Sequence, residues 1–193
     1  EEGSYIDPYE LADTERILRN LNFISDAKVE VLPLDDQPGW ADVAVFVRDR
    51  WPLGVKGKIV TKDRYSAEFF HRNIGGTGLN FEWEVPVNRT KEPSRGRRLR
   101  LSYANILSTF TSFEVQTRTD WEKEEYSGAL KRDLVHPGIK FVGGISASRT
   151  TDKDVDVLPE GTHLRRDVLD PWIGWNFRSV MEISAAEWPN GKR

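Results

Sequence analysis

Residues 79–85 alternate apolar and polar side chains with a period of two. Leu79, Phe81, Trp83 and Val85 fall on one side of an extended strand, and Asn80, Glu82 and Glu84 fall on the other. The alternation returns at 113–121, where Phe113, Val115 and Trp121 share one face and Glu114, Gln116, Arg118 and Asp120 share the opposite face. Such a sheet must set its apolar face against a second sheet or against lipid, and the function depends on which of the two it is.

From Val55 onward the pattern predicts strands and no helix. We expect strands at about 55–62, 64–72, 78–87, 97–106, 111–121, 125–132, 138–150 and 171–182. Pro52, the 73–78 turn, the 88–96 loop and residues 136–138 separate them, and residues 151–168 are expected to form a long charged loop. Consecutive strands with short connections predict an antiparallel meander.

Two interpretations of this meander stay open. Several strands exceed the usual length of about five or six residues and match the roughly 9–11 residues that a tilted strand needs to cross a bilayer. Aromatic residues lie within or near the strand ends, where an interfacial girdle would sit: Tyr103, Trp121, Tyr126, Trp172 and Trp175. In the alternative, a soluble β-sandwich, these aromatics fill the space between two sheets.

The first fifty residues predict a small α+β layer. Asp7 and Pro8 form a helix start, and an apolar stripe at helical spacing follows until about Asn20 to Asn22. Phe23-Ile24 is expected to be a buried plug or a turn of helix. Strands are predicted at 27–32 and 41–48, joined by a turn at 35–39.

Composition narrows the classes of function. The 193 residues carry a formal net charge of -3, which argues against a nucleic-acid partner. Cysteine is absent, so disulfides, thiolate metal sites and a cysteine nucleophile are excluded. No apolar run reaches the roughly 18 residues of a membrane-spanning helix. The first residues lack the features of a signal peptide, which we expect to have been removed or to lie upstream.

Candidate chemistry is sparse, and we expect no enzyme, no metal site and no cofactor. His71, His136 and His163 lack metal-ligand spacing. Glu82 and Glu84 lie on one face and could form a carboxylate pair, as in glycosidases, but a solvated strand face or a barrel lumen shows the same alternate charges. The glycines of residues 75–78 lack the Gly-Lys-Ser/Thr ending of a phosphate loop. A basic cluster, formed by Arg95, Arg97, Arg98 and Arg100, suits either a lipid headgroup or a solvated loop.

Several segments resemble the BamA/TamA-type superfamily of outer-membrane assembly and translocation proteins. The helix with Glu15-Arg16-Ile17-Leu18-Arg19, the 21–27 connection, the strand pair at 29–31 and 41–45, and the ending 47–51 are similar to the last POTRA module of that family. The 73–78 segment is similar to the family's Asn-x-x-Gly-x-Gly turn, and 101–105 resembles its Ser-Tyr-x-Asn stretch. The family's later Arg-Gly-aromatic loop and its closing strand with a terminal aromatic have no counterpart.

The resemblance implies a mainly β fold: a short α+β POTRA-like module followed by an antiparallel transmembrane-type β-meander, which is a partial barrel. The module is expected at 1–52, with its first strand missing, and the N-terminal strands of an outer-membrane β-barrel at 53–193. The implied function is insertion of proteins into, or their translocation across, a bacterial outer membrane, with the module in the periplasm. The alternative is a soluble β-sandwich binding module for carbohydrate or peptide.

The family also implies partners and a site. The partners are unfolded outer-membrane client proteins, the lipid bilayer and possible accessory periplasmic proteins. In this family the first barrel strand is an open edge that can template a client strand, and 55–61 occupies the matching place. We therefore expect the client-strand edge at Val55, Gly57, Ile59 and Thr61.

Overall fold

The computed structural model describes residues 5–106, 109–135, 139–153 and 162–177. By its internal contacts the chain divides into two units. The first holds residues 1–51 with 135–139 and 177–193, and the second holds residues 52–134 and 140–176. The fold is mainly β, with antiparallel sheets and one short helix among the described residues.

The first unit contains helix α1 (Pro8–Arg19) and the antiparallel pair β1 (Ile24–Pro33) and β2 (Ala41–Asp49). The predicted helix start is confirmed, because the Asp7 carboxylate accepts a hydrogen bond from the Tyr9 amide at 2.9 Å. The buried apolar residues of this unit are Ile24, Ala27 and Ile139, which are 5%, 1% and 6% exposed. The predicted burial at 23–24 is thus confirmed for Ile24, but Ile24 is the first residue of β1 and not part of a turn of helix.

The helix α1 has 12 residues. Nowhere in the described part of the chain is a helix long and apolar enough to cross a membrane.

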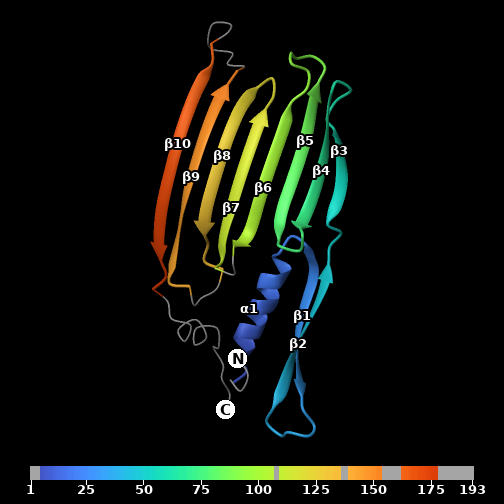
Figure 1. The fold of residues 1–193 in the computed structure, drawn as a ribbon, viewed down its shortest axis with the longest axis vertical. Coiled ribbons are helices and arrows are strands. Elements are labelled where there is room, and N and C mark those ends of the chain that lie inside the picture. Colours follow the sequence, from blue (N-terminus) through green and yellow to red (C-terminus); the bar gives the residue numbers. More distant parts are fainter. Residues whose placement is uncertain (1–4, 107–108, 136–138, 154–161, 178–193) are drawn as a thin grey trace. The chain divides into compact units, whose positions relative to one another are not determined.

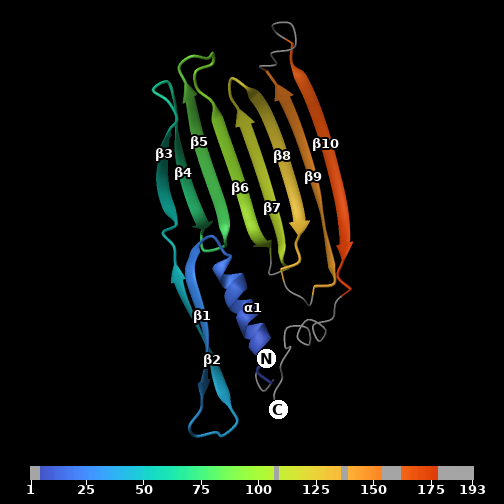
Figure 2. The same ribbon diagram turned by 180° about the vertical axis from the view of Figure 1, so that it is seen from behind.

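The second unit is one eight-stranded sheet (Figures 1 and 2). Its strands are β3 (Leu53–Ile59), β4 (Arg64–Ile74), β5 (Leu79–Asn88), β6 (Arg97–Ile106), β7 (Thr111–Thr119), β8 (Lys123–Arg132), β9 (Phe141–Asp152) and β10 (Leu164–Trp175). Each strand pairs antiparallel with its neighbour in sequence, so the predicted meander is confirmed. The sheet is open within the described residues, with β3 and β10 at its edges.

The last strand begins earlier than the pattern predicts. Leu164 lies opposite Asp152, so residues 164–168 belong to β10 and not to a loop. This stretch lacks an apolar signal because its polar side chains bond across the ladder, as Arg149 does with Asp167 at 2.8 Å. The end of the predicted strand, 178–182, lies outside the described residues.

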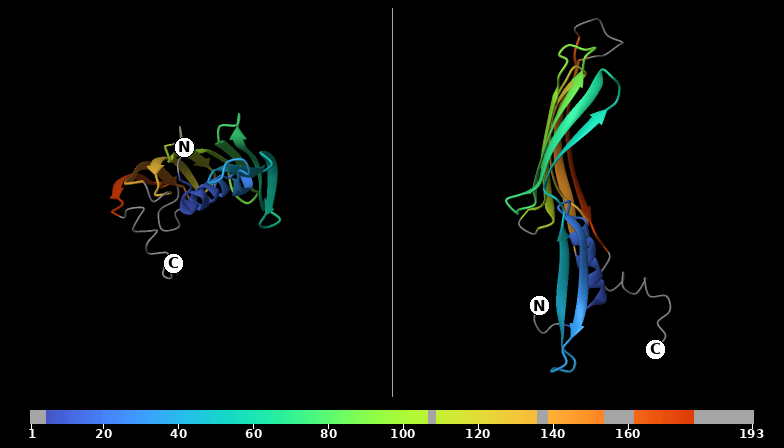
Figure 3. Two further views of the ribbon diagram at one scale, coloured as in Figure 1. Left: turned by 90° about the horizontal axis from the view of Figure 1, so that it is seen from below. Right: turned by 90° about the vertical axis from the view of Figure 1, so that its right-hand side faces the viewer.

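The register sorts all eight strands into two faces. Phe69 lies opposite Trp83, Trp83 opposite Leu99 and Leu99 opposite Thr117, so these side chains share one face. This apolar face holds odd-numbered residues from β3 to β7 and from β9 to β10, and even-numbered residues of β8. Seen from below and from the side, the strands form one twisted layer (Figure 3).

Candidate functional site

The apolar face is exposed. Among the side chains that the sequence places on it, Trp83 is 46% and Val115 47% exposed, and Phe81 and Phe113 are half-buried. Other large apolar side chains on this face are also exposed: Val55, Phe69, Leu99, Leu130, Ile145, Leu169 and Ile173. Among the described residues of the second unit, no further layer covers them. An uncovered apolar surface of this kind marks an interaction with lipid or with a partner protein.

Aromatic rings contact one another along this face. Phe69 and Phe81, on β4 and β5, have ring centroids 6.5 Å apart, and Tyr103 and Phe113, on β6 and β7, have theirs 6.2 Å apart. Each of these ring contacts joins neighbouring strands of the same sheet, whereas in a sandwich the rings would contact an opposing sheet.

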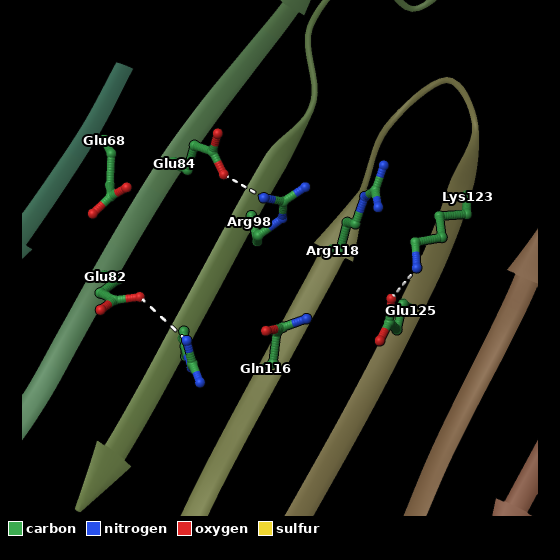
Figure 4. A pocket seen from close by; sticks show the side chains of 9 residues that line it. Glu68, Glu82, Glu84, Arg98, Gln116, Arg118, Lys123 and Glu125 are labelled. Carbon is green, nitrogen blue, oxygen red and sulfur yellow. Dashed lines mark hydrogen bonds and ion pairs between the residues drawn. The ribbon is translucent and has the colours of Figure 1, made fainter. Parts of the chain in front are cut away.

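The opposite face carries a lattice of charges (Figure 4). It lines a depression of about 450 Å³, formed by Glu68, Glu82, Glu84, Arg98, Arg100, Gln116, Arg118, Lys123 and Glu125. The charges are paired between neighbouring strands: Arg98 lies 2.5 Å from Glu84, and Arg100 lies 2.7 Å from Glu114 and 3.8 Å from Glu82. We call this surface the charged face.

The two carboxylates considered for catalysis, Glu82 and Glu84, lie on the charged face and face arginines. Each is half-buried and engaged by a guanidinium on β6. The negative charges of Glu82 and Glu84 are thus balanced by the arginines of the neighbouring strand.

A network fixes the end of the sheet that lies uppermost in Figure 1, which we call the upper end. Asp120, between β7 and β8, is 1% exposed and accepts hydrogen bonds from the amides of Glu122 and Lys123 at 3.0 Å each. Arg118 bonds to the same carboxylate at 2.5 Å and to Glu122 at 3.1 Å. Burial alone would raise the pKa of the Asp120 carboxyl, but the hydrogen bonds from Arg118, Lys123 and Glu122 outweigh it and lower the pKa below its usual value.

The connection between β5 and β6 packs closely against this network. Gly96, just before β6, leaves no room for a side chain, because a Cβ there would lie 2.6 Å from Cβ of Asp120 and 2.8 Å from the carbonyl oxygen of Thr119. Arg64 of β4 reaches Glu122 at 3.2 Å. Three connections of the upper end are thereby held together.

The edge strand β3 holds three of the four residues expected at the client edge. The amide of Val60 bonds to the carbonyl of Arg64 at 2.9 Å, and that of Arg72 to the carbonyl of Pro52 at 2.6 Å. Both pairs fit the β3–β4 register, in which hydrogen-bonded and non-hydrogen-bonded pairs alternate. The even-numbered residues of β3 therefore bond to β4.

The odd-numbered residues of β3 then direct their N–H and C=O groups to the open side. They are Leu53, Val55, Gly57 and Ile59. The side chains of Val55 and Ile59 are 75% and 84% exposed. Thr61 lies beyond the end of β3, in the turn to β4, where its amide bonds to the carbonyl of Arg64 at 3.0 Å. The free ladder thus ends at Ile59, and Thr61 is not part of it.

The opposite edge, β10, differs in chemistry. The amide of Asn176 bonds to the carbonyl of Lys140 at 2.8 Å, so the odd-numbered residues of β10 face outward. Pro171 belongs to this outward row and has no N–H to offer. Asp167, in the same row, is held by Arg149 and Arg165. Proline and charges are features that protect a sheet edge from a further strand.

The predicted aromatic girdle holds only in part. Tyr103, Tyr126 and Trp175 lie on the apolar face. Trp121 is 7% exposed and buried in the β7–β8 connection, because the chain turns at Asp120 before the alternation reaches it. Trp172 lies opposite Gly144 on the other face of the sheet.

The histidines are not brought together. His71 lies on the apolar face of β4, with Nδ1 3.1 Å from the carbonyl oxygen of Arg72. His163 is exposed just before β10, and His136 lies outside the described residues. In the part of the chain that the structure describes, no three His, Asp or Glu side chains are grouped to hold a metal ion.

Two features of the site escaped the sequence. Which residues of β3 direct their N–H and C=O groups outward depends on which pairs of the β3–β4 hairpin are hydrogen-bonded, and no residue type determines that. The basic cluster is divided between the two faces, with Arg98 and Arg100 on the charged face and Arg97 on the apolar face. This division was predictable, because adjacent residues of a strand point to opposite sides.

Comparison with protein-family models and with curated protein sequences finds no match. Among solved structures, the fold is similar to the crystal structure of BamA from Haemophilus ducreyi lacking POTRA domains 1–3, with a TM-score of 0.49 and 13% sequence identity. The similarity covers 93% of this chain and 40% of that one, so the chain spans less than half the length of its structural neighbour. A likeness this distant assigns neither a family nor an activity.

Proposed function

We propose that this chain contributes the first strands of an outer-membrane β-barrel that inserts proteins into the membrane or passes them across it. The observation that carries the proposal is a one-layer sheet with an exposed apolar face, a charged opposite face and an open first edge. The activity requires no catalytic residue, no metal and no cofactor.

The two faces fit the two environments of a barrel wall. On β9, the apolar-face residues from Phe141 to Ala147 are apolar or glycine. The outward face of a strand in an outer-membrane barrel has the same composition, with apolar residues at every second position. The charged face, with its half-buried ion pairs, suits a lumen that contains water.

The open edge of β3 supplies the mechanism. An unpaired row of N–H and C=O groups can add a strand from another chain by main-chain hydrogen bonds, whatever the sequence of that strand. Val55, Gly57 and Ile59 direct these groups outward, and none of the row is proline. Client strands with varied side chains can therefore pair at the same edge.

The edge is tied down on its other side. Gly54 lies opposite Phe70, whose ring occupies the space where a Cβ of residue 54 would be, at 2.2 Å. Lys56 lies 4.8 Å from the centroid of the same ring and 2.8 Å from the Glu68 carboxylate. These contacts hold β3 against β4 while its outer side is left for a partner.

The first unit is proposed to be the end of a POTRA-like module on the periplasmic side. The resemblance of residues 15–51 to such a module and the helix-plus-hairpin architecture of α1, β1 and β2 support this assignment. The partners are unfolded outer-membrane clients, the bilayer and periplasmic accessory proteins.

Crosslinking in the full-length protein tests the proposal. A photoreactive amino acid at Val55 or Ile59 is expected to capture a client during its assembly. Matched positions are Ala67, one strand inward on the same face, and Leu169 on the other edge. Capture confined to the loops, or equal at all four positions, would reject the edge as the site.

Two other functions make different predictions. A soluble sandwich that binds carbohydrate or peptide would stay monomeric in buffer without detergent, because its apolar face would be covered. A structural barrel without insertase activity would need a membrane too, but depletion of its gene would leave the other barrels of the outer membrane at normal levels.

A further inference from the structure

The basic cluster of residues 95–100 is two groups with different surroundings. Arg98 and Arg100 lie on the charged face and are ion-paired with Glu84 and Glu114. Arg97 lies opposite Thr119, and Arg95 forms a bridge with Val87. Both therefore belong to the apolar face, at its upper end.

The guanidinium groups at this end are available to a ligand. Arg95 and Arg97 are exposed, and within the described residues neither forms an ion pair. Arg89 lies beside them with its guanidinium 5.6 Å from the centroid of the Tyr65 ring, and Tyr65 is paired with Val87. Arg89 and Arg95 thus lie on either side of the half-buried Val87, and Arg97 is the next residue of this face along the chain.

On β9 and β10, the arginines of the same face are ion-paired. There, Arg149 and Arg165 both contact the carboxylate of Asp167, at 2.8 Å and 2.9 Å. Those cations are neutralised by the protein itself. Among the described residues, Arg89, Arg95 and Arg97 form no ion pair of this kind, although they lie at the same end of the sheet.

The apolar band begins directly below the three arginines. Leu99 follows Arg97 on the apolar face of β6, beside Trp83 and Phe69. A ligand here meets positive charge at one end and apolar side chains at the other, and a lipid with an anionic headgroup has that construction. Arginine also binds phosphate through two parallel hydrogen bonds.

We propose that Arg89, Arg95 and Arg97 bind the phosphate of an anionic lipid in the leaflet that the upper end faces. The acyl chains lie along Leu99 and Trp83. The inference rests on the proposed function only in that the apolar face must lie in a membrane; it does not depend on client assembly.

The test measures lipid retention. The full chain is folded into phosphatidylcholine vesicles that contain a minority of phosphatidic acid, and the bound lipids are counted by native mass spectrometry. Wild type is expected to retain phosphatidic acid preferentially. The variant Arg95→Gln/Arg97→Gln is expected to bind it at least about tenfold more weakly. The control, Lys58→Gln/Arg166→Gln, removes the same charge from the opposite face, at the two edge strands.

The outcomes separate the two proposals. If wild type and Arg95→Gln/Arg97→Gln both insert and retain the lipid equally, this site is overturned and the proposed function is not. If the control loses as much lipid as Arg95→Gln/Arg97→Gln, net charge alone explains the binding, and the site is overturned too. Release of the lipid by inorganic phosphate would identify a site for the free anion and overturn the lipid assignment. If no variant inserts into vesicles, the membrane function itself is wrong.

Discussion

The carboxamide oxygen of Asn73 accepts a hydrogen bond from the amide of Gly78 at 2.6 Å. This bond closes the turn between β4 and β5, in which Asn73, Gly75, Gly76 and Gly78 all have positive φ. Asparagine and glycine tolerate that backbone conformation better than other residues. The Asn-x-x-Gly-x-Gly pattern is thus a conformational requirement of this turn.

The next connection at the same end repeats the bond without the glycines. The side-chain oxygen of Asn105 accepts from the amide of Phe110, again five residues later, at 2.8 Å. In both hairpins a register shift precedes the turn, between His71 and Ile74 and between Tyr103 and Ile106. One asparagine therefore ends each of these two ladders in the same way.

Replacing Asn73 by alanine is expected to lower the free energy of unfolding by about 2 kcal/mol, from the lost hydrogen bond and the positive φ. The midpoint of urea-induced unfolding measures it. Asn73→Asp keeps the acceptor oxygen and is expected to lose less than half as much. Equal losses in the two variants would show that the hydrogen bond does not stabilise the turn.

Gly96→Ala is expected to destabilise the sheet by about 1–3 kcal/mol, because its Cβ would overlap Asp120 and the carbonyl of Thr119. Gly57→Ala is the matched change, since nothing lies within 4 Å of a Cβ there. It should be neutral or slightly stabilising, through the unfolded chain. The same urea measurement compares them, and a harmless Gly96→Ala would disprove the close packing of the upper end.

Asp120 is expected to give the protein an acid-sensitive component of stability. Its pKa is lowered in the folded state, so the stabilisation is present above the unfolded-state pKa of about 4 and is lost as the pH falls through the lower folded-state pKa. Asp120→Asn should be less stable than wild type at neutral pH, and the gap should narrow below about pH 4. A gap that stays constant with pH would contradict this assignment.

The alternation of residues 79–85 predicted β5 and its two faces because every second residue is strongly apolar or polar. The same rule failed at Trp121, where the Asp120 carboxylate turns the chain, and at 164–168, where an edge strand needs no apolar residues. Both failures come from hydrogen bonds that the period of a sequence does not contain.

The candidate site was predictable to the level of the strand. Residues 55–59 could be placed at an edge by resemblance and by their position before the first hairpin. That their odd-numbered members face outward follows from which residue of β3 first bonds to β4, and that is set by the geometry of the 60–63 turn.

The central claim is that the apolar face of the sheet lies in hydrocarbon. Since the sequence has no cysteine, single Val115→Cys and Gln116→Cys variants can each carry one nitroxide label on opposite faces of β7. In vesicles, the label at 115 should be accessible to oxygen dissolved in the lipid, and the label at 116 to a water-soluble nickel complex. A label at 115 that is shielded from both reagents, or reached only by the nickel complex, would contradict the account.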